Sequence, residues 1–412
     1  MKRGFLNTGK TNRIRLNDLS QGHPTTHRSG ASPPEHSDAN FKLSSFSRTY
    51  SRSPYIVSAD HRVLDTTSIH FLFHPAPSAD LVFVDTLPNI LLFEAFMSRL
   101  PPLPAESPPF IIRDCGHKGV GVFARHAIGR GDLIIRERPV YVSRPGIVTS
   151  SGTFYESALA GLSVSAQSSF MSMRNAQPPV VGPILGRIQT NALAAKPPFG
   201  SEVKSHYPAL FPRLCRLNHD CTPNTHYSFS TETFSGQLFA VRPIQVGEEL
   251  TLGYVDLAAP REIRKKGLRA KYMFECTCST CELPVEQALV SDIRRREIAR
   301  YFLKMADGKK IPDGATLGEA KQLIQYARDE GLTEALSILL VSALRIARRD
   351  GNYEEELKCV VDSVSCVRAL EGNEAMTFQA MARRFGLTPG ELGQVLDSEE
   401  PIDYGRFRPL LR

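Results

Sequence analysis

Three cysteines lie within six residues, at Cys276-Thr-Cys278-Ser-Thr-Cys281. Neighbours this close cannot all reach separate disulfide partners in acceptable geometry, so metal ligation explains them better. Three thiolates are one ligand short of the four in a closed tetrahedral zinc site. The alternative is a set of unrelated buried thiols. Because no apolar secretory segment follows Met1, the cysteines indicate a reducing compartment, the cytosol or the nucleus.

Three further segments contain residue types that suit ligand binding. The first is the turn Gly119-Val120-Gly121, where glycine permits close backbone approach to a bulky ligand. The second is Asn218-His219-Asp-Cys221-Thr-Pro-Asn, and the third is Gly247-Glu-Glu-Leu-Thr-Leu-Gly-Tyr254. Each segment alone is a weak signal, and a bare Gly-x-Gly is usually a plain turn. The four segments together, in one order, are a strong signal.

In this order the segments resemble the SET-domain protein lysine methyltransferases, over about Phe110 to Cys281. The chain is most similar to the SET-and-MYND branch and its fungal relatives, although it lacks the cysteines for a MYND finger. The resemblance implies methyl transfer from S-adenosylmethionine to the ε-amine of lysine in a protein, histone or non-histone. The alternative is an inactive SET-like scaffold for protein–protein interaction. Retention of Tyr254 and the Asn218-His219 pair favours the enzyme.

Methyl transfer to lysine is an in-line displacement that depends on aligning the reactants and excluding water. A lysine at its ordinary pKa of about 10.4 is protonated, and a narrow apolar channel would lower that pKa. The resemblance implies that Tyr254 is catalytic, because its phenol could orient the amine and stabilise the polarised methyl group. Tyr272 would line the lysine channel with Tyr254, and Phe274 would pack on adenine. The alternative for all three aromatic residues is a packing role in the core.

The resemblance also implies a fourth metal ligand and a cofactor site. Cys221 would complete a structural zinc site with Cys276, Cys278 and Cys281, and the ion would clamp the tail of the domain over the active site. For Asn191 a helix-capping role is an equal alternative to cofactor binding. The implied cofactor-binding residues are Gly119, Val120, Gly121, Asn191, Asn218, His219 and Phe274.

The elements that must position these residues are short β-type runs. They are separated by Gly, Pro, Asp and Ser, which is typical of small twisted sheets. Helical spacing between Phe154 and Ala195 predicts a helical insert at about residues 150–210. We therefore predict an α+β fold with a SET-like β core over residues 110–257. The resemblance implies that the Asn218 strand and the segment ending in Tyr254 meet in a pseudoknot. The expected strands are 110–113, 121–124, 132–137, 225–230, 238–242 and 249–254.

The chain outside this core has other patterns. Residues 1–109 are predicted to be of low order and to end in a Pro-rich linker, and one hypothesis is that translation starts at Met97. Residues 258–285 are the predicted zinc segment. Residues 286–412 are predicted to form α-helical hairpins similar to a tetratricopeptide array. Its expected helices are 319–330, 333–350 and one starting at Tyr353, after a turn at Gly351-Asn352.

The net charge of +7 is concentrated in a run at residues 261–271 and in Arg294-Arg295-Arg296. The favoured interpretation is a solvated helix face with ion pairs. The alternative is a surface for nucleosome or nucleic-acid contact. No run of about 18 apolar residues occurs, so no membrane span is predicted. We expect a chromatin-regulating enzyme of the nucleus, the cytoplasm or both.

Overall fold

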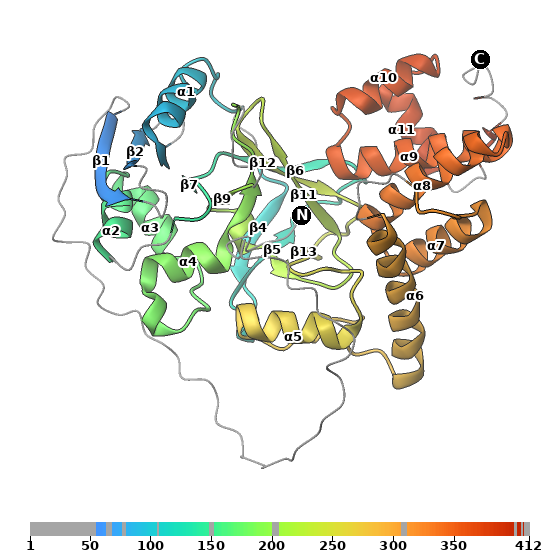
Figure 1. The fold of residues 1–412 in the computed structure, drawn as a ribbon, viewed down its shortest axis with the longest axis horizontal. Coiled ribbons are helices and arrows are strands. Elements are labelled where there is room, and N and C mark those ends of the chain that lie inside the picture. The colour runs from blue at the N-terminus through green and yellow to red at the C-terminus, as the bar shows by residue number, and fades with distance from the viewer. Residues whose placement is uncertain are drawn as a thin grey trace, which may run out of the picture.

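The computed structural model describes residues 55–62, 68–75, 80–104, 107–147, 152–199, 206–305, 311–398, 402–404 and 407 (Figure 1). Three small sheets form the centre of the molecule. Helices α2 to α4 lie on one side of these sheets, and helices α6 to α11 lie on the other. The predicted α+β fold is confirmed.

The sheet that carries the candidate site has the strand order β10-β13-β5-β4. Its strands are β10 (Asn218–His219), β13 (Glu249–Leu252), β5 (Val120–Ala124) and β4 (Phe110–Asp114). Strand β10 pairs in parallel with β13, and the other two pairs are antiparallel. The predicted meeting of the Asn218 strand with the segment before Tyr254 is therefore confirmed.

A second sheet has the order β11-β12-β6 and is entirely antiparallel. Its strands are β11 (Thr225–Ser230), β12 (Ser235–Ala240) and β6 (Leu133–Glu137). The strand predicted at 238–242 begins three residues earlier, at Ser235, because Ser235 pairs with Ser230 at the hairpin end. The other predicted strands of both sheets are confirmed within two residues.

The third sheet includes strands from the region predicted to be of low order. Its order is β1-β2-β3-β7-β9-β8, formed by β1 (Tyr55–Arg62), β2 (Ser68–His74), β3 (Leu81–Thr86), β7 (Tyr141–Ser143), β9 (Tyr207–Leu210) and β8 (Leu193–Ala195). Every residue of β3 is buried. Helix α1 (Leu87–Met97) packs beside it, with the Phe93 ring stacked on Phe83 at a centroid distance of 4.0 Å.

The prediction of low order for residues 1–109 is therefore wrong for 55–62, 68–75 and 80–97, and the part before residue 55 lies outside the described residues. The physical reason is a non-local pairing. Strand β3 pairs in parallel with β7, across a long stretch of sequence that includes the linker. One hydrophobic core extends from Ile69 to Leu252 and includes Met97, so the folded unit is larger than residues 110–257.

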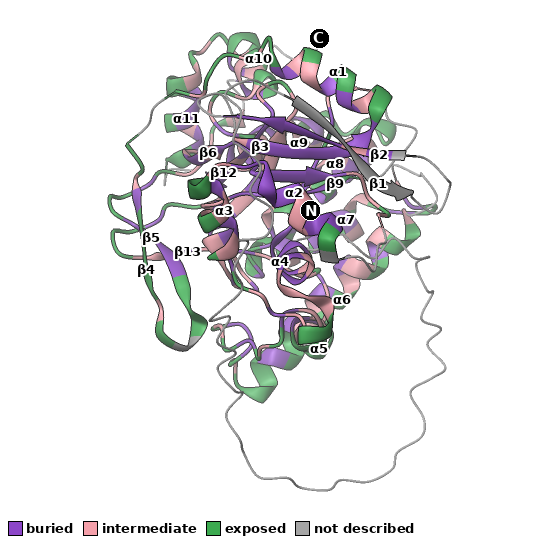
Figure 2. Cartoon of the chain, turned by 90° about the vertical axis from the view of Figure 1, so that its left-hand side faces the viewer, coloured by how far each residue is buried: buried purple, intermediate pink, exposed green. Residues whose placement is uncertain are grey.

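The helical insert is confirmed, and it ends in strands β8 and β9. It contains α2 (Gly152–Ala160), α3 (Val164–Met171), the short 3-10 helix η2 (Pro179–Val181) and α4 (Pro183–Asn191). Because β9 pairs with β7 and β8 pairs with β9, the end of the insert completes the six-stranded sheet that holds the N-terminal strands. Figure 2 shows these central strands as the most buried part of the chain.

The predicted C-terminal helices are confirmed. After α5 (Arg261–Tyr272), the chain forms α6 (Val285–Lys304), α7 (Leu317–Asp329), α8 (Thr333–Arg349), α9 (Tyr353–Glu371), α10 (Met376–Arg384) and α11 (Pro389–Asp397). Gly351 has a φ of +68° at the predicted hairpin turn, and the Asn352 side chain caps α9 by accepting from the Glu355 N–H. None of the helices in the described part of the chain is both long and apolar enough to span a bilayer.

Candidate active site and metal centre

Strands β10 and β13 bring the predicted catalytic tyrosine to the predicted cofactor histidine. The backbone N–H of Tyr254 donates to Nδ1 of His219 at 3.0 Å. The Tyr254 hydroxyl donates to the carbonyl of Leu217, the residue just before β10. The two rings lie 5.3 Å apart. The parallel pairing therefore fixes both ends of Tyr254 against the Asn-His segment.

The side chain of Asn218 is held by β5 and β13. Its Nδ2 donates to Oε1 of Glu249 at 2.8 Å and to the carbonyl of Val120 at 3.3 Å. The other Glu249 oxygen pairs with Nζ of Lys118 at 3.4 Å. Glu249 was part of a recognised segment but had no predicted role, and it proves to be the contact that orients Asn218.

The two glycines of the Gly-x-Gly turn are required for different reasons. Gly119 has a φ of +78°, and a Cβ there would meet nothing within 4 Å. Its glycine is needed for backbone conformation. A Cβ on Gly121 would lie 2.9 Å from Oε1 of Glu249 and 3.0 Å from Sγ of Cys115. At Gly121 the crowding comes from protein atoms, and intrusion of a side chain on the ligand stays a prediction.

Aromatic rings from the end of α5 lie against Tyr254. The Tyr272 ring is 4.9 Å from the Tyr254 ring, and its hydroxyl donates to the Tyr254 carbonyl at 3.5 Å. Met273 takes a φ of +56°, which ends α5 and turns the chain toward the cysteines. The Phe274 ring then lies 6.3 Å from His219. The structure thus brings the three predicted aromatic residues and His219 together.

A cavity of about 320 Å³ lies between these elements, within the size range of small-molecule sites. Of the predicted cofactor and channel residues, all except Gly121 line it. Three cationic side chains, Lys118, Arg174 and Arg216, line it as well, and they suit the carboxylate of the cofactor's amino-acid part. Arg216 stands just before the Asn-His segment, whereas nothing in the sequence marked Arg174. The donor set, the aromatic rings and the size fit S-adenosylmethionine.

Asn191 lies at a helix end and at the wall of the cavity. It is the last residue of α4 and lines the cavity, with 3% of its surface exposed. Its Nδ2 donates to the carbonyls of Arg174 at 2.7 Å and Arg187 at 2.8 Å. The amide therefore satisfies carbonyls at the helix end, and cofactor binding by Asn191 stays a prediction.

The four predicted metal ligands converge. The sulfur atoms of Cys221, Cys276, Cys278 and Cys281 all lie within 4.8 Å of one another. Tetrahedral zinc with Zn–S bonds of about 2.3 Å needs sulfurs about 3.8 Å apart, so the thiols fit the ion. The four remaining cysteines are isolated in the sequence, which predicts core positions. Cys215, Cys359 and Cys366 are buried, whereas Cys115 is only half-buried.

Donors from two sides approach the sulfur of Cys221. Nε of Arg264 lies 3.1 Å from it, and Nε2 of His219 lies 3.3 Å from it. Burial works to lower the pKa of Arg264, but the sulfurs of Cys221 and Cys281 outweigh burial and raise that pKa above its ordinary value. The guanidinium therefore stays charged beside the thiols.

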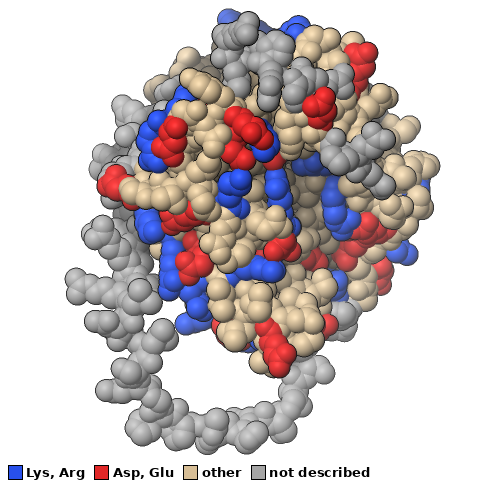
Figure 3. Space-filling view, turned by 90° about the vertical axis from the view of Figure 1, so that its right-hand side faces the viewer, with Lys and Arg blue, Asp and Glu red and all other residues tan. Residues whose placement is uncertain are grey.

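The basic runs are partly buried and partly solvated. Arg264 and Arg295 are 1% and 0% exposed, so the prediction of a solvated face is wrong for these two residues. Arg269 pairs with Glu275 at the surface. Figure 3 shows acidic and basic side chains interspersed on the face that carries the C-terminal helices, where Arg328 pairs with Asp362. Nucleic-acid contact stays a prediction.

Comparison with known proteins finds sequences that are similar to the part of the chain that holds most of this site. Residues 119–255 match the family model described as SET domain. The chain is 27% identical over 282 residues to "Histone-lysine N-methyltransferase set5" of Schizosaccharomyces pombe, covering 68% of this chain and 84% of that protein. It is 27% identical over 208 residues to human "Histone-lysine N-methyltransferase SMYD1", covering 48% of this chain and 36% of that protein.

Two further matches are a shorter sequence match and a solved structure. Human "Histone-lysine N-methyltransferase SMYD3" is 45% identical over 73 residues, which cover 18% of this chain and 17% of that protein. The chain therefore spans much less than two thirds of either human relative. The structure of the Neurospora SET domain protein DIM-5, a histone lysine methyltransferase, aligns at 17% identity and a TM-score of 0.20, covering 37% of this chain and 54% of that chain. Residues 119–255 thus match the SET domain, and the proteins similar to this chain include SMYD1 and SMYD3.

Proposed function

We propose that this protein transfers a methyl group from S-adenosylmethionine to the ε-amine of lysine in a protein substrate. The observation that carries the proposal is the shared cavity, where Asn218 and His219 meet the aromatic pair of Tyr254 and Tyr272. The names of the relatives, histone-lysine N-methyltransferases, support lysine as the acceptor. Histones are therefore the first substrates to test, and we infer a nuclear or cytoplasmic location.

A second cavity suggests where the substrate enters. It has a volume of about 240 Å³ and is lined by Gly253 and Val255, the two neighbours of Tyr254. The segment around Tyr254 thus separates this cavity from the cofactor cavity. Asp256 and Glu334 contribute carboxyl groups to the second cavity, which suits a lysine-rich segment of a basic protein.

The aromatic pair has a defined chemical role in this proposal. S-adenosylmethionine, when bound, supplies an activated methyl group on its sulfonium. Tyr254 donates its own hydroxyl hydrogen to the Leu217 carbonyl, so the phenol oxygen is left to accept a hydrogen bond from the lysine nitrogen. The rings of Tyr254 and Tyr272, 4.9 Å apart, exclude water and favour the neutral amine by desolvation.

The test is a methylation assay on the full chain with labelled S-adenosylmethionine, core histones and a nuclear or cytosolic extract. Tyr254→Phe should lower kcat about 100-fold, the order of magnitude found for removal of one preorganised hydrogen bond to the transition state. Binding of the demethylated cofactor product, measured by calorimetry, should change little. Tyr353→Phe is the matched control, because Tyr353 is 68% exposed on α9.

Two outcomes would remove the enzyme proposal. One is equal labelling by the wild type and Tyr254→Phe, and the other is no labelling by either protein with any substrate. Cofactor binding without methyl transfer would favour the alternative, a catalytically inactive scaffold for protein–protein interaction. Mass spectrometry of the labelled product would identify the residue that carries the methyl group.

A further inference from the structure

Two buried guanidinium groups lie next to the thiol cluster. Arg264 on α5 and Arg295 on α6 are 1% and 0% exposed. A buried charge is costly unless it is paired and hydrogen-bonded. The partners of these two residues therefore indicate what each charge does.

Arg264 faces the sulfurs. Its Nε lies 3.1 Å from Sγ of Cys221, and its Nη1 donates to the carbonyl of Ala259 at 2.5 Å. Among the described residues, no carboxylate lies within ion-pair distance of Arg264. Four thiolates around a divalent ion leave two excess negative charges, so the loaded cluster provides the counter-charge that Arg264 needs.

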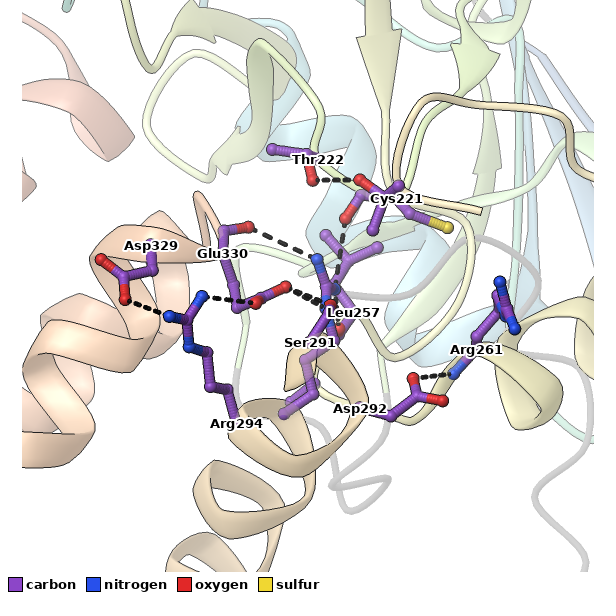
Figure 4. Close-up of polar contacts among 12 residues, drawn as sticks. Cys221, Thr222, Leu257, Arg261, Ser291, Asp292, Arg294, Asp329 and Glu330 are labelled. Carbon is purple, nitrogen blue, oxygen red and sulfur yellow. Dashed lines mark hydrogen bonds and ion pairs between the residues drawn. The ribbon is translucent and has the colours of Figure 1, made fainter. Parts of the chain in front are cut away.

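Arg295 joins the metal loop to the C-terminal helices. Its partners include Cys221, Leu257 and Glu330, which are labelled in Figure 4. Its Nε donates to Oε2 of Glu330 at 2.9 Å, at the end of α7. From the same guanidinium, Nη1 donates to the carbonyls of Cys221, at 3.4 Å, and Leu257. Ser291 on α6 donates to the same Glu330 oxygen at 2.6 Å. The Arg295 guanidinium therefore contacts three separate parts of the chain, at Cys221, Leu257 and Glu330.

Cys221 is the residue that these contacts share. Its sulfur faces Arg264 and His219, and its carbonyl accepts from Arg295. His219 in turn accepts from the backbone of Tyr254. A displacement of Cys221 would thus move a metal ligand and a wall of the cofactor cavity together.

We propose that Arg264 and Arg295 are positioning residues that hold Cys221 for the metal, so that metal retention depends on helices α5 to α7 as well as on the four cysteines. Arg264 acts on the sulfur through charge and a hydrogen bond. Arg295 acts on the backbone of the same residue through its pair with Glu330. Partners outside the ligand set typically change metal affinity by about 10–100-fold.

The test measures zinc release from the zinc-loaded full chain to a chromogenic chelator, without substrate or cofactor. Arg264→Lys, Arg264→Ala, Arg295→Lys and Glu330→Gln should each release zinc about tenfold faster or more. Arg296→Ala is the matched control, because Arg296 is the exposed neighbour of Arg295 on α6 and should release zinc at the wild-type rate.

A spectroscopic readout distinguishes the effect of Arg264 on the Cys221 sulfur from the effect of Arg295 on the Cys221 backbone. In the cobalt-substituted protein, the thiolate-to-metal absorption band should shift in both Arg264 variants, because a donor to the sulfur is lost or moved. It should keep its position in Arg295→Lys and Glu330→Gln, which leave the sulfur contacts unchanged. A merely structural role for Arg264 would not produce this selective shift.

Release at the control rate by Arg264→Lys and by Glu330→Gln would overturn the proposal, as would a wild-type chain that binds no zinc. Far-ultraviolet circular dichroism would report whether Arg264→Ala folds. If it does not, the zinc release rates of Arg264→Lys and Glu330→Gln decide whether the proposal holds. Because no methyl transfer is measured, failure of the proposed enzyme function would leave this result standing.

Discussion

Nδ1 of His219 accepts a hydrogen bond from the backbone N–H of Tyr254 at 3.0 Å. A neutral imidazole that accepts at Nδ1 carries its proton on Nε2. That atom lies 3.3 Å from Sγ of Cys221 and therefore donates to the sulfur. The His219 ring thus links the proposed catalytic tyrosine to a proposed metal ligand, and the two hydrogen bonds are separable by substitution.

His219→Ala should lower kcat/KM by tenfold or more, because it leaves a buried donor unpaired at a cost of about 1–3 kcal/mol. His219→Asn should recover much of that loss, since an asparagine oxygen takes the place of Nδ1 but its side chain is too short to reach Cys221. Methylation kinetics for both variants check the prediction. Equal losses would show that the contact with Tyr254 contributes nothing.

The candidate site was predictable because its residues lie in short segments of fixed spacing. The four cysteines, the Asn218-His219 pair and Tyr254 all carry their signal in local sequence. Several residues around them carry no such signal. Arg174 reaches the cavity from a loop of the insert, and Arg264 looked like one more charge in a solvated basic helix. Only packing shows that it faces a sulfur.

The N-terminal strands could not be predicted for a related reason. The run at residues 81–96 is largely apolar. The partner of its strand, β7, lies 59 residues further along the chain, as in the pairing of Val84 with Ser143. Loop closure over that separation leaves no periodic signature in the sequence. By contrast, helices α7 to α9 depend on local spacing and caps, and their predicted positions agree with the structure.

Metal content should depend on Cys276 but not on an equally buried cysteine elsewhere. Cys276→Ser removes one of four converging sulfurs and should yield a chain with less than one zinc per molecule and no binding of the demethylated cofactor product. Cys366→Ala, in α9, should retain one zinc. Elemental analysis and calorimetry provide the readout. Full zinc content in Cys276→Ser would exclude this residue as a ligand.

The buried carboxyl of Asp85 should make the folded state more stable in mild acid than at neutral pH. Burial raises the pKa of this carboxyl above its ordinary value of 3.8, against the hydrogen bond from Tyr207. The native state then keeps the proton to higher pH than the unfolded chain. The resulting stability is present at low pH and is lost as pH rises through the raised pKa.

Asp85→Asn should remove this dependence, so the wild type should gain stability relative to the variant between about pH 7 and about pH 4.5. Urea unfolding at both pH values measures the difference. Asp350→Asn is the exposed control. Arg349 lowers the pKa of Asp350, so the stability that Asp350 contributes rises with pH, opposite to that of Asp85. A constant difference between the wild type and Asp85→Asn would contradict the assignment.

Gly121→Ala should weaken cofactor binding through Glu249 and not through direct contact. The new Cβ would lie 2.9 Å from Oε1 of Glu249, the same atom that accepts from Asn218 at 2.8 Å. Displacing that oxygen costs about one hydrogen bond, so Kd for the demethylated cofactor product should rise about tenfold. Gly119→Ala should instead lower stability by about 1–3 kcal/mol, because its φ of +78° strains any other residue.

A double-mutant cycle distinguishes these mechanisms. In a Glu249→Ala background the alanine at position 121 has no carboxylate to displace, so its effect on Kd should largely disappear. Calorimetric titration of the two single variants and the double variant measures the coupling. Additive effects would mean that position 121 contacts the ligand itself. Strong non-additivity would establish that the turn glycine works by leaving space for the carboxylate that orients Asn218.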